Sequence, residues 1–211
     1  MPKLFYFPVQ GRAQSIRFLL DSKNVQFEDM RITGAEWGPM KAAATYGDAQ
    51  LPIYVKDDGS VMTQSMAILR SLAMEHGYAC ETADVMYETE WFFGMLGDTF
   101  EKPERFAILK DDATEEDQDK CIKVLDTVMD KLEARWADGR TYVGKSENPT
   151  AADFCWLSLI TSHYENTNGK HQKIVAAAAA KLAASPNVLR VIAPMKDLCR
   201  ATIDAMPASS I

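Results

Sequence analysis

The stretch QLPIYVKDDGSVMTQSMAI, from Gln50 to Ile68, decides the fold of the first third of this sequence. Pro52 stands at the start of a predicted strand, LPIYV, where its missing N–H removes one hydrogen bond from the sheet. The DDG turn leads to a short paired strand, SVM, and a helix begins at the polar pair Gln64-Ser65. We therefore predict a β-hairpin followed by a helix that stops at Gly77.

The residues before this stretch alternate between strand and helix patterns. KLFYF (3–7) predicts a strand, and SIRFLLDSKN places Ile16, Leu19 and Leu20 on one face of a helix. VQFEDMRI (25–32) predicts a second strand, and the glycines and proline of residues 34–39 predict a loop. Strand, helix, strand, hairpin and helix together predict an α/β domain over residues 1–77.

The sequence changes in character between Tyr78 and Ala83, and the remainder predicts an all-helical domain over residues 84–211. TEEDQDKCIKVLDTVMDKLEARW (114–136) has apolar residues at helical spacing, with Thr114 placed to cap its start. KIVAAAAAKLAASP predicts another helix, which ends before Pro186. NPTAADFCWLSLI predicts a third, with a threonine and an aspartate in capping-box spacing.

Composition excludes several classes of function. The 23 basic and 30 acidic residues give a net charge of −7, without the basic stripe that nucleic-acid binding requires. An acidic surface also argues against binding to anionic membranes. The cysteines and histidines lie too far apart for metal-ligand spacing, and the N-terminus lacks the apolar core of a signal peptide. We therefore expect no metal, reduced thiols and a cytoplasmic protein.

The opening stretch also predicts a binding site. A proline before a strand is compatible with a cis peptide bond, and Leu51 could then pair with an extended peptide as an added strand. The helix start at Gln64-Ser65 offers free N–H groups to an anion. Together these features describe a pocket for a short peptide with a terminal carboxylate. Taken singly, Pro52 at an edge strand and Ser65 as a helix cap are also explained by structure alone.

Three segments, YFPVQGRAQSIRFLL, QLPIY and TQSMAILRSLA, resemble the amino-terminal domain of the soluble glutathione S-transferases, most closely their tyrosine-dependent Pi and Sigma classes. TYVGKSENPTAADF resembles the buried capping segment of that family's helical domain, so the resemblance covers nearly the whole chain. It implies a thioredoxin-like first domain, an all-α second domain that contributes a hydrophobic substrate pocket, and glutathione as co-substrate.

The resemblance also implies roles for individual residues. Tyr6 matches the catalytic tyrosine. The family's glutathione site is matched by Tyr6, Arg12, Trp37, Lys41, Gln50, Leu51, Pro52, Gln64 and Ser65. The hydrophobic substrate pocket is matched by Phe7, Val9 and Met95, and Tyr46 matches the aromatic residue that inserts into the partner of a homodimer. For Tyr6 and for the residues of the substrate pocket, core packing is the competing interpretation. Trp37 could instead be an ordinary loop aromatic, Lys41 a solvated charge and Arg12 a charge at the entry of the helix.

A thiol with an ordinary pKa of about 8.5 is mostly protonated at neutral pH, and only the thiolate is a good nucleophile. A tyrosine hydroxyl that donates a hydrogen bond to sulfur favours the thiolate. The sequence therefore predicts conjugation of glutathione to small hydrophobic electrophiles. Glutathione-dependent isomerisation, as in prostaglandin D synthases, and a crystallin-like structural role are the alternatives.

Two departures from the family pattern stand out. Asp48-Ala49 are extra residues in the TYGDAQLP segment, next to the expected glutathione site. Trp91-Phe92 occupy the place of an aspartate that commonly reaches the neighbouring subunit's ligand. Loss of a carboxylate near the amino group of the ligand would weaken glutathione binding unless another acid replaces it.

Overall fold

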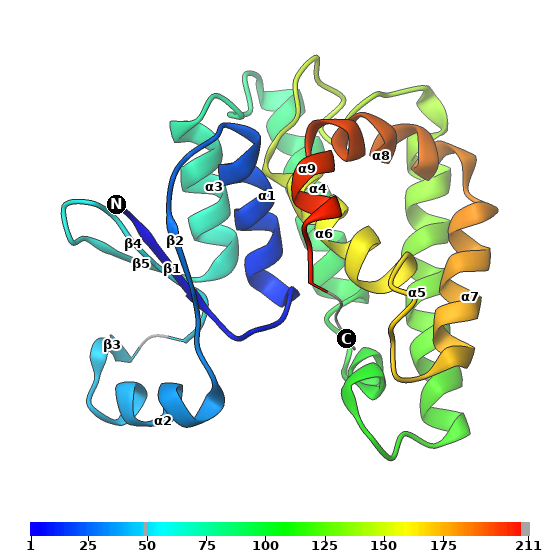
Figure 1. Cartoon of the computed structure of the whole chain (residues 1–211). Coiled ribbons are helices and arrows are strands. Elements are labelled where there is room, and N and C mark those ends of the chain that lie inside the picture. The colour runs from blue at the N-terminus through cyan, green and yellow to red at the C-terminus, as the bar shows by residue number, and fades with distance from the viewer. Residues whose placement is uncertain (49, 208–211) are drawn as a thin grey trace. The chain divides into compact units, whose positions relative to one another are not determined.

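The computed structural model describes residues 1–48 and 50–207 (Figure 1). The chain divides into two compact units, Met1–Ala79 and Cys80–Ile211. The division lies inside the segment from Tyr78 to Ala83 where the sequence changes character. The first unit is α/β and the second is helical, which is the fold class that the sequence predicts.

The first unit follows the predicted order of strands and helices, with two additional elements, α2 and β3. Its elements are β1 (Lys3–Tyr6), the 3-10 turn η1 (Gly11–Ala13), α1 (Gln14–Ser22), β2 (Glu28–Arg31), α2 (Gly34–Ala42), β3 (Thr45–Asp48), β4 (Ile53–Val55), β5 (Val61–Thr63) and α3 (Ser65–Glu75).

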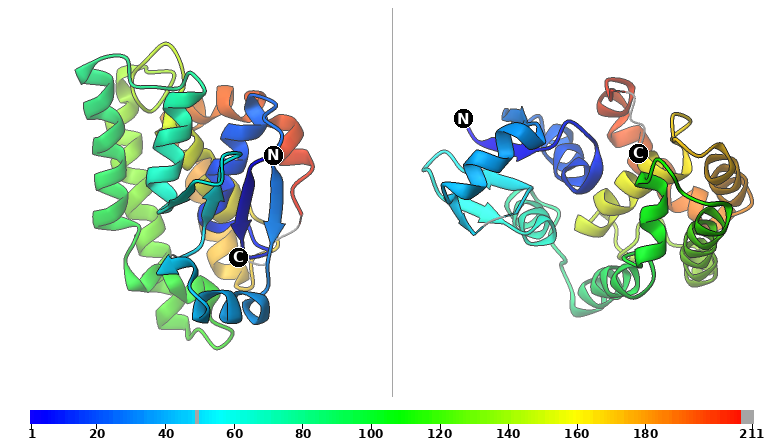
Figure 2. Two further views of the ribbon diagram at one scale, coloured as in Figure 1. Left: turned by 90° about the vertical axis from the view of Figure 1, so that its left-hand side faces the viewer. Right: turned by 90° about the horizontal axis from the view of Figure 1, so that it is seen from below.

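Four strands form a sheet in the order β2-β1-β4-β5. β1 and β2 are parallel, whereas β4 is antiparallel to both β1 and β5. Figure 2 (left) shows these strands side by side, with α2 beyond one end of them. The predicted hairpin is therefore confirmed, and it lies next to β1, where it completes the sheet.

Alternating side chains of β1 point to opposite faces of the sheet. Phe5 forms a buried cluster with Ile32 and Ile53, and the side chains packed against this cluster come from β2, α2, β3, β4 and the residue before Pro52. α1 and α3 pack against each other (Figure 1). The apolar residues that the sequence assigns to the α1 face, such as Ile16 and Leu19, are fully buried.

Residues 34–42 form a helix, so the prediction of a loop there is wrong. The Thr33 hydroxyl accepts the Glu36 N–H, and the Glu36 carboxylate accepts the Thr33 N–H, which is a complete capping box. Trp37 and Met40 also pack against the Phe5 cluster. Capping and packing together offset the unfavourable helix propensities of Gly38 and Pro39.

The second unit is helical, as predicted. Its elements are α4 (Ala83–Thr99), the 3-10 segment η2 (Pro103–Leu109), α5 (Glu115–Arg135), η3 (Trp136–Asp138), α6 (Ala151–Leu159), the π-helical turn η4 (Ile160–Tyr164), α7 (Gln172–Ala183), α8 (Pro186–Leu198) and α9 (Arg200–Asp204). Thr114 caps α5, and its hydroxyl accepts the Asp117 N–H. Pro186 begins α8, a position that suits proline because the first helical N–H needs no intrahelical partner.

Large aromatic side chains fill the interior of this unit. The rings of Trp136 and Trp156 lie 5.6 Å apart, and the ring of Phe92 packs against both. The segment that resembles the family's buried cap is built around Asp153, which is fully buried. Its carboxylate accepts the N–H of Val143 and the N–H and hydroxyl of Thr150. Burial nevertheless raises the Asp153 pKa to about 6, since it disfavours the charge more than these donors favour it.

In the described part of the chain, no single helix has both the length and the apolar composition of a membrane span. α7 and α8 meet that test only as a pair, and they are bent by 95° at the break between them.

Candidate glutathione site

The strand register brings the predicted site segments to one end of the sheet. Met30, Phe5, Ile53 and Thr63 form a row across the four strands. One residue further toward the same end of the sheet, the four strands continue with Arg31, Tyr6, Pro52 and Gln64, in the same order. Neighbouring strands lie about 4.8 Å apart, so the path from Tyr6 to Gln64 crosses about 10 Å. An extended tripeptide has a similar length.

Tyr6 ends β1 and is almost fully buried. Its hydroxyl oxygen accepts the backbone N–H of Arg12 at 3.1 Å. Gly11 makes this contact possible: its φ is +41°, and a Cβ added there would lie 2.6 Å from the same oxygen. The turn after β1 therefore closes directly over the phenol, and the hydroxyl keeps its own proton for a different acceptor.

Gln64 and Ser65 join β5 to α3. Gln64 has φ +70° and ψ 105°, a combination that is rare for a residue with a side chain. Such a conformation costs on the order of 1–3 kcal/mol and is often retained at binding sites. Ser65 is the first residue of α3 and is buried. The first N–H groups of the helix lack intrahelical partners, and they favour an anion at this point.

The peptide bond between Leu51 and Pro52 is cis, in agreement with the sequence-based interpretation. Leu51 packs against the Phe5 cluster, and Pro52 is buried. Trp37 packs against the same cluster from α2, while Lys41 is exposed in the last turn of that helix. Trp37 and Lys41 are four residues apart, so both lie on one face of α2.

The other predicted residues have less distinctive surroundings. The side chains of Arg12 and Gln50 are exposed, and Phe7 and Val9 are half-buried in the turn after β1. Tyr46 is also half-buried, and its ring centroid lies 5.3 Å from that of Phe5 in the same chain. Met95, in α4 of the second unit, is buried and accepts a hydrogen bond from Thr99 through its sulfur. Of the extra pair Asp48-Ala49, Ala49 lies outside the described residues.

Sequence reasoning missed one buried ion pair close to Tyr6. Arg17 of α1 is almost fully buried, and its Nε donates to both carboxylate oxygens of Asp29 at 3.1 and 3.2 Å. A signal was present, because Arg17 interrupts an apolar run between Ile16 and Phe18. An arginine in such a run is rarely buried unless it is paired.

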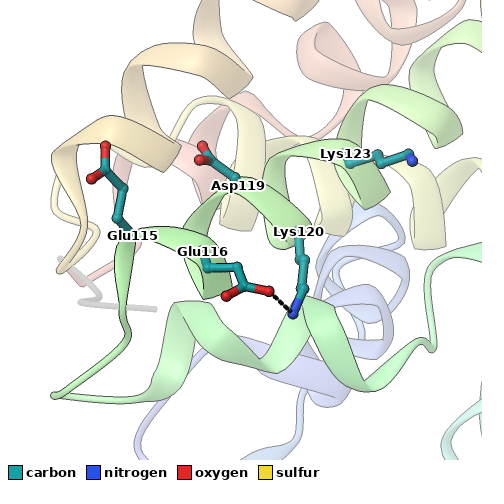
Figure 3. Close-up of a pocket in the computed structure, with 5 residues that line it drawn as sticks. All are labelled: Glu115, Glu116, Asp119, Lys120 and Lys123. Carbon is teal, nitrogen blue, oxygen red and sulfur yellow. Dashed lines mark ion pairs between the residues drawn. The ribbon is translucent and has the colours of Figure 1, made fainter.

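A depression of about 410 Å³ lies on the first turns of α5 in the second unit (Figure 3). Five charged side chains line it: Glu115, Glu116, Asp119, Lys120 and Lys123. Lys120 pairs with Glu116 at 2.7 Å, and Lys173 of α7 pairs with both other acids. This exposed surface, on which four of the five charged side chains form ion pairs, does not suit a hydrophobic ligand. In residues 1–48 and 50–207, no group of three or more His, Cys, Asp or Glu side chains is placed to hold a metal ion.

Known proteins resemble this chain over most of its length. It is 34% identical to the hematopoietic prostaglandin D synthase of Gallus gallus over 189 residues, which cover 82% of this chain and 86% of that protein. It is 29% identical to the class-mu 28 kDa glutathione S-transferase isozyme of Schistosoma bovis over 90% of this chain and 93% of that one. No family model matches the sequence.

The chain belongs to the glutathione S-transferase family.

A solved structure supports the same fold. The monomeric glutathione S-transferase Na-GST-3 of Necator americanus matches with a TM-score of 0.79 at 19% identity, over 100% of this chain and 99% of that one. The α/β unit is thus the thioredoxin-like domain of a glutathione S-transferase, and the helical unit is the second domain. The predicted fold class and family are confirmed.

Proposed function

We propose that this glutathione S-transferase binds glutathione at the end of the sheet that carries Tyr6, and that the Tyr6 hydroxyl stabilises the ligand's thiolate. The contact between the Arg12 N–H and the Tyr6 oxygen carries the proposal. Because that N–H occupies a lone pair of the phenol, the phenol's own proton is directed to another partner. A hydroxyl that both accepts and donates is also polarised toward stronger donation.

Positive groups around the sheet end match the two carboxylates of the tripeptide. The start of α3 at Ser65 suits the γ-glutamyl carboxylate, and Lys41 suits the glycine carboxylate. The backbone of Leu51 would pair with the cysteinyl unit between them. The tripeptide then lies along the path from Tyr6 past Pro52 to Gln64, with its sulfur next to Tyr6.

The activated sulfur would attack a hydrophobic electrophile. Phe7, Val9 and Met95 remain the predicted residues of the electrophile pocket. The protein supplies no nucleophile of its own: it binds the thiol, favours its ionised form and excludes water from it. We also propose that the protein works in the cytoplasm in the detoxification of such compounds.

The test compares Tyr6→Phe with the wild type in the conjugation of a chloronitrobenzene. We expect kcat to fall about 10²-fold, as for the loss of one donor to a developing or bound anion. Tyr54→Phe is the matched control, because Tyr54 is a buried tyrosine of the same sheet on β4. Equal rates for Tyr6→Phe and the wild type would remove Tyr6 from the mechanism.

The similarity to a prostaglandin D synthase favours a second candidate, glutathione-dependent isomerisation. In that reaction the thiolate adds to the substrate and later leaves, so the product contains no glutathione. Mass spectrometry of products from an endoperoxide substrate separates the two reactions. Failure of the protein to bind immobilised glutathione, with no turnover of any electrophile, would instead favour the crystallin-like structural role.

We further propose a homodimer in which Tyr46 contacts the partner. Because the Tyr46 ring is only half-buried in its own chain, part of it remains available for such a contact. Sedimentation at micromolar concentration should give twice the mass of one chain, and Tyr46→Ala should shift the equilibrium toward monomer. A wild-type protein that sediments as a monomer contradicts this assembly.

A further inference from the structure

Arg17 is a buried charge that the proposed reaction does not use directly. It lies in the first turns of α1, and its side chain is only 4% exposed. Burial lowers the Arg17 pKa, and the charge of Asp29 offsets only part of that effect. An arginine kept at such a cost should have a structural or functional reason.

The contacts of Arg17 join three parts of the first unit. Nε donates to Asp29 of β2. Nη1 donates to the carbonyl oxygens of Val9 and Gln10 at 3.2 and 3.3 Å, and to the Gln14 side chain at 3.3 Å. The planar guanidinium therefore ties the turn after β1 to a carboxylate on the neighbouring strand. A lysine ammonium, as a point charge, cannot reproduce this fork.

The turn held by Arg17 is the one that closes over Tyr6. Gln10 precedes Gly11, and the N–H of Arg12 contacts the Tyr6 oxygen. In the register of β1 and β2, Tyr6 lies opposite Arg31, two residues from Asp29. Asp29, Arg31 and Tyr6 are the ionisable groups that act on the Arg17 charge. Tyr6 and Arg17 are thus linked through the turn, which Arg17 bonds at Val9 and Gln10 and which contacts Tyr6 at Arg12.

We propose that Arg17 is a positioning residue for catalysis: with Asp29 as its anchor, it holds the turn at Val9 and Gln10 so that the Arg12 N–H stays on the Tyr6 hydroxyl. This inference rests on the proposed role of Tyr6. Arg17 need not touch glutathione. Its effect passes through the phenol, which donates a weaker hydrogen bond to the thiolate when the turn is loosened.

The experiment measures the pH dependence of kcat/KM for glutathione conjugation, together with the ultraviolet absorbance of the bound thiolate. Arg17→Met should raise the apparent pKa of the bound glutathione thiol by about one unit, so the neutral-pH rate falls about tenfold. KM for glutathione should change less than threefold. Arg17→Lys keeps a positive charge but cannot make the guanidinium's several hydrogen bonds at once. It should therefore show most of the same rise in the thiol pKa.

Arg31→Met is the matched control. Arg31 also donates to Asp29, at 2.7 Å, so its loss removes a neighbouring charge from the same carboxylate. Among the described residues the Arg31 side chain bonds only Asp29, whereas Arg17 also bonds the turn. The Arg31 variant should keep the wild-type pH profile.

A second measurement shows whether Arg17 acts through Tyr6. In a Tyr6→Phe background, Arg17→Met should add almost no further loss, because the donor that Arg17 positions is already gone. Wild-type pH profiles for both Arg17 variants, or full recovery in Arg17→Lys, would overturn the positioning role. If Arg17→Met fails to fold, the lysine variant decides the question. Failure of the proposed role of Tyr6 can be told apart from failure of the Arg17 role, since Tyr6→Phe would then match the wild type.

Discussion

Arg17 in the first unit and Arg140 in the second are both almost completely buried, but their surroundings differ. Arg140 donates to both oxygens of Asp138, to Glu88 and to the Val143 carbonyl, at 2.8–3.0 Å. Arg17 has one carboxylate and longer bonds, and its Nη2 has no hydrogen-bond partner among the described residues. Every guanidinium nitrogen of Arg140 thus donates a hydrogen bond, whereas one nitrogen of Arg17 does not.

The pKa shifts follow this difference. Burial lowers the pKa of Arg140, but the hydrogen bonds and charges of Asp138 and Glu88 outweigh burial, and its pKa is raised overall. For Arg17 burial prevails, and the pKa is lowered. The comparison teaches that burial alone does not identify a functional residue. A buried charge that is incompletely paired, beside a tight turn and a candidate catalytic group, is the more informative observation.

The largest expected effect is on stability, in the second unit. Arg140→Met leaves Glu88 and Asp138 without their shared buried partner, so we expect a loss of about 3–5 kcal/mol in the free energy of unfolding. Arg17→Met should cost less, because Arg17 pairs with a single carboxylate through longer bonds and the burial of its charge already opposes folding. Urea unfolding of both variants, followed by circular dichroism, measures the difference. Equal losses would mean that the two ion pairs have the same structural role.

A third buried arginine, Arg105, sharpens the comparison, because a neutral histidine, His163, contacts it. Arg105 lies 3.3 Å from His163 Nε2, and burial together with the Arg105 charge lowers the His163 pKa to about 3. The folded pKa is below the unfolded value, so this contribution to stability is present above about pH 6.5 and is lost as pH falls toward 3. Between pH 7 and 5 the loss should be about 2 kcal/mol.

Comparison with His163→Gln measures this loss, since glutamine can still accept from Arg105 but does not titrate. Asp153 acts in the opposite direction: its folded pKa of about 6 is raised, so its contribution falls as pH rises from about 4 to 6. Because both proteins contain Asp153, its contribution cancels when the unfolding free energy of the variant is subtracted from that of the wild type at each pH. A difference that stays constant from pH 7 to 5 would show that the imidazole is not held neutral by the fold.

Much of the fold was predictable because its signals are local. The hairpin is set by two short apolar runs, LPIYV and SVM, on either side of the DDG turn, and Thr114 with its acidic first turn marks the start of α5. The helix at residues 34–42 carried a readable capping box, Thr33 with Glu36. The glycines and the proline of the same segment favour a loop, so its local signals conflict. The miss was one of interpretation, since the information was present in the sequence.

The site was less predictable, because its decisive features depend on register and backbone conformation. Asp29 becomes the partner of Arg17 only when β2 pairs with β1 in the observed register. The φ of +70° at Gln64 has no sequence signal, since glutamine ordinarily avoids that region. The resemblance to a family supplied the site residues, but it supplied no contact between Arg12 and Tyr6. Such contacts are properties of the folded turn.

The smallest expected change in stability belongs to the turn over Tyr6, and it comes with a loss of activity. Gly11→Ala forces a side chain into φ +41° and places a Cβ 2.6 Å from the Tyr6 oxygen. Gly59→Ala is the matched control: its φ is +84°, but its Cβ would meet no described atom within 4 Å.

Both variants should lose about 1–2 kcal/mol of stability from the positive φ. Only Gly11→Ala should also lose transferase activity, by tenfold or more, because the turn must move off the phenol. Since the two substitutions share the backbone cost, any difference in kcat isolates the contact with Tyr6, and equal kcat values would show that the turn can shift without disturbing the reaction.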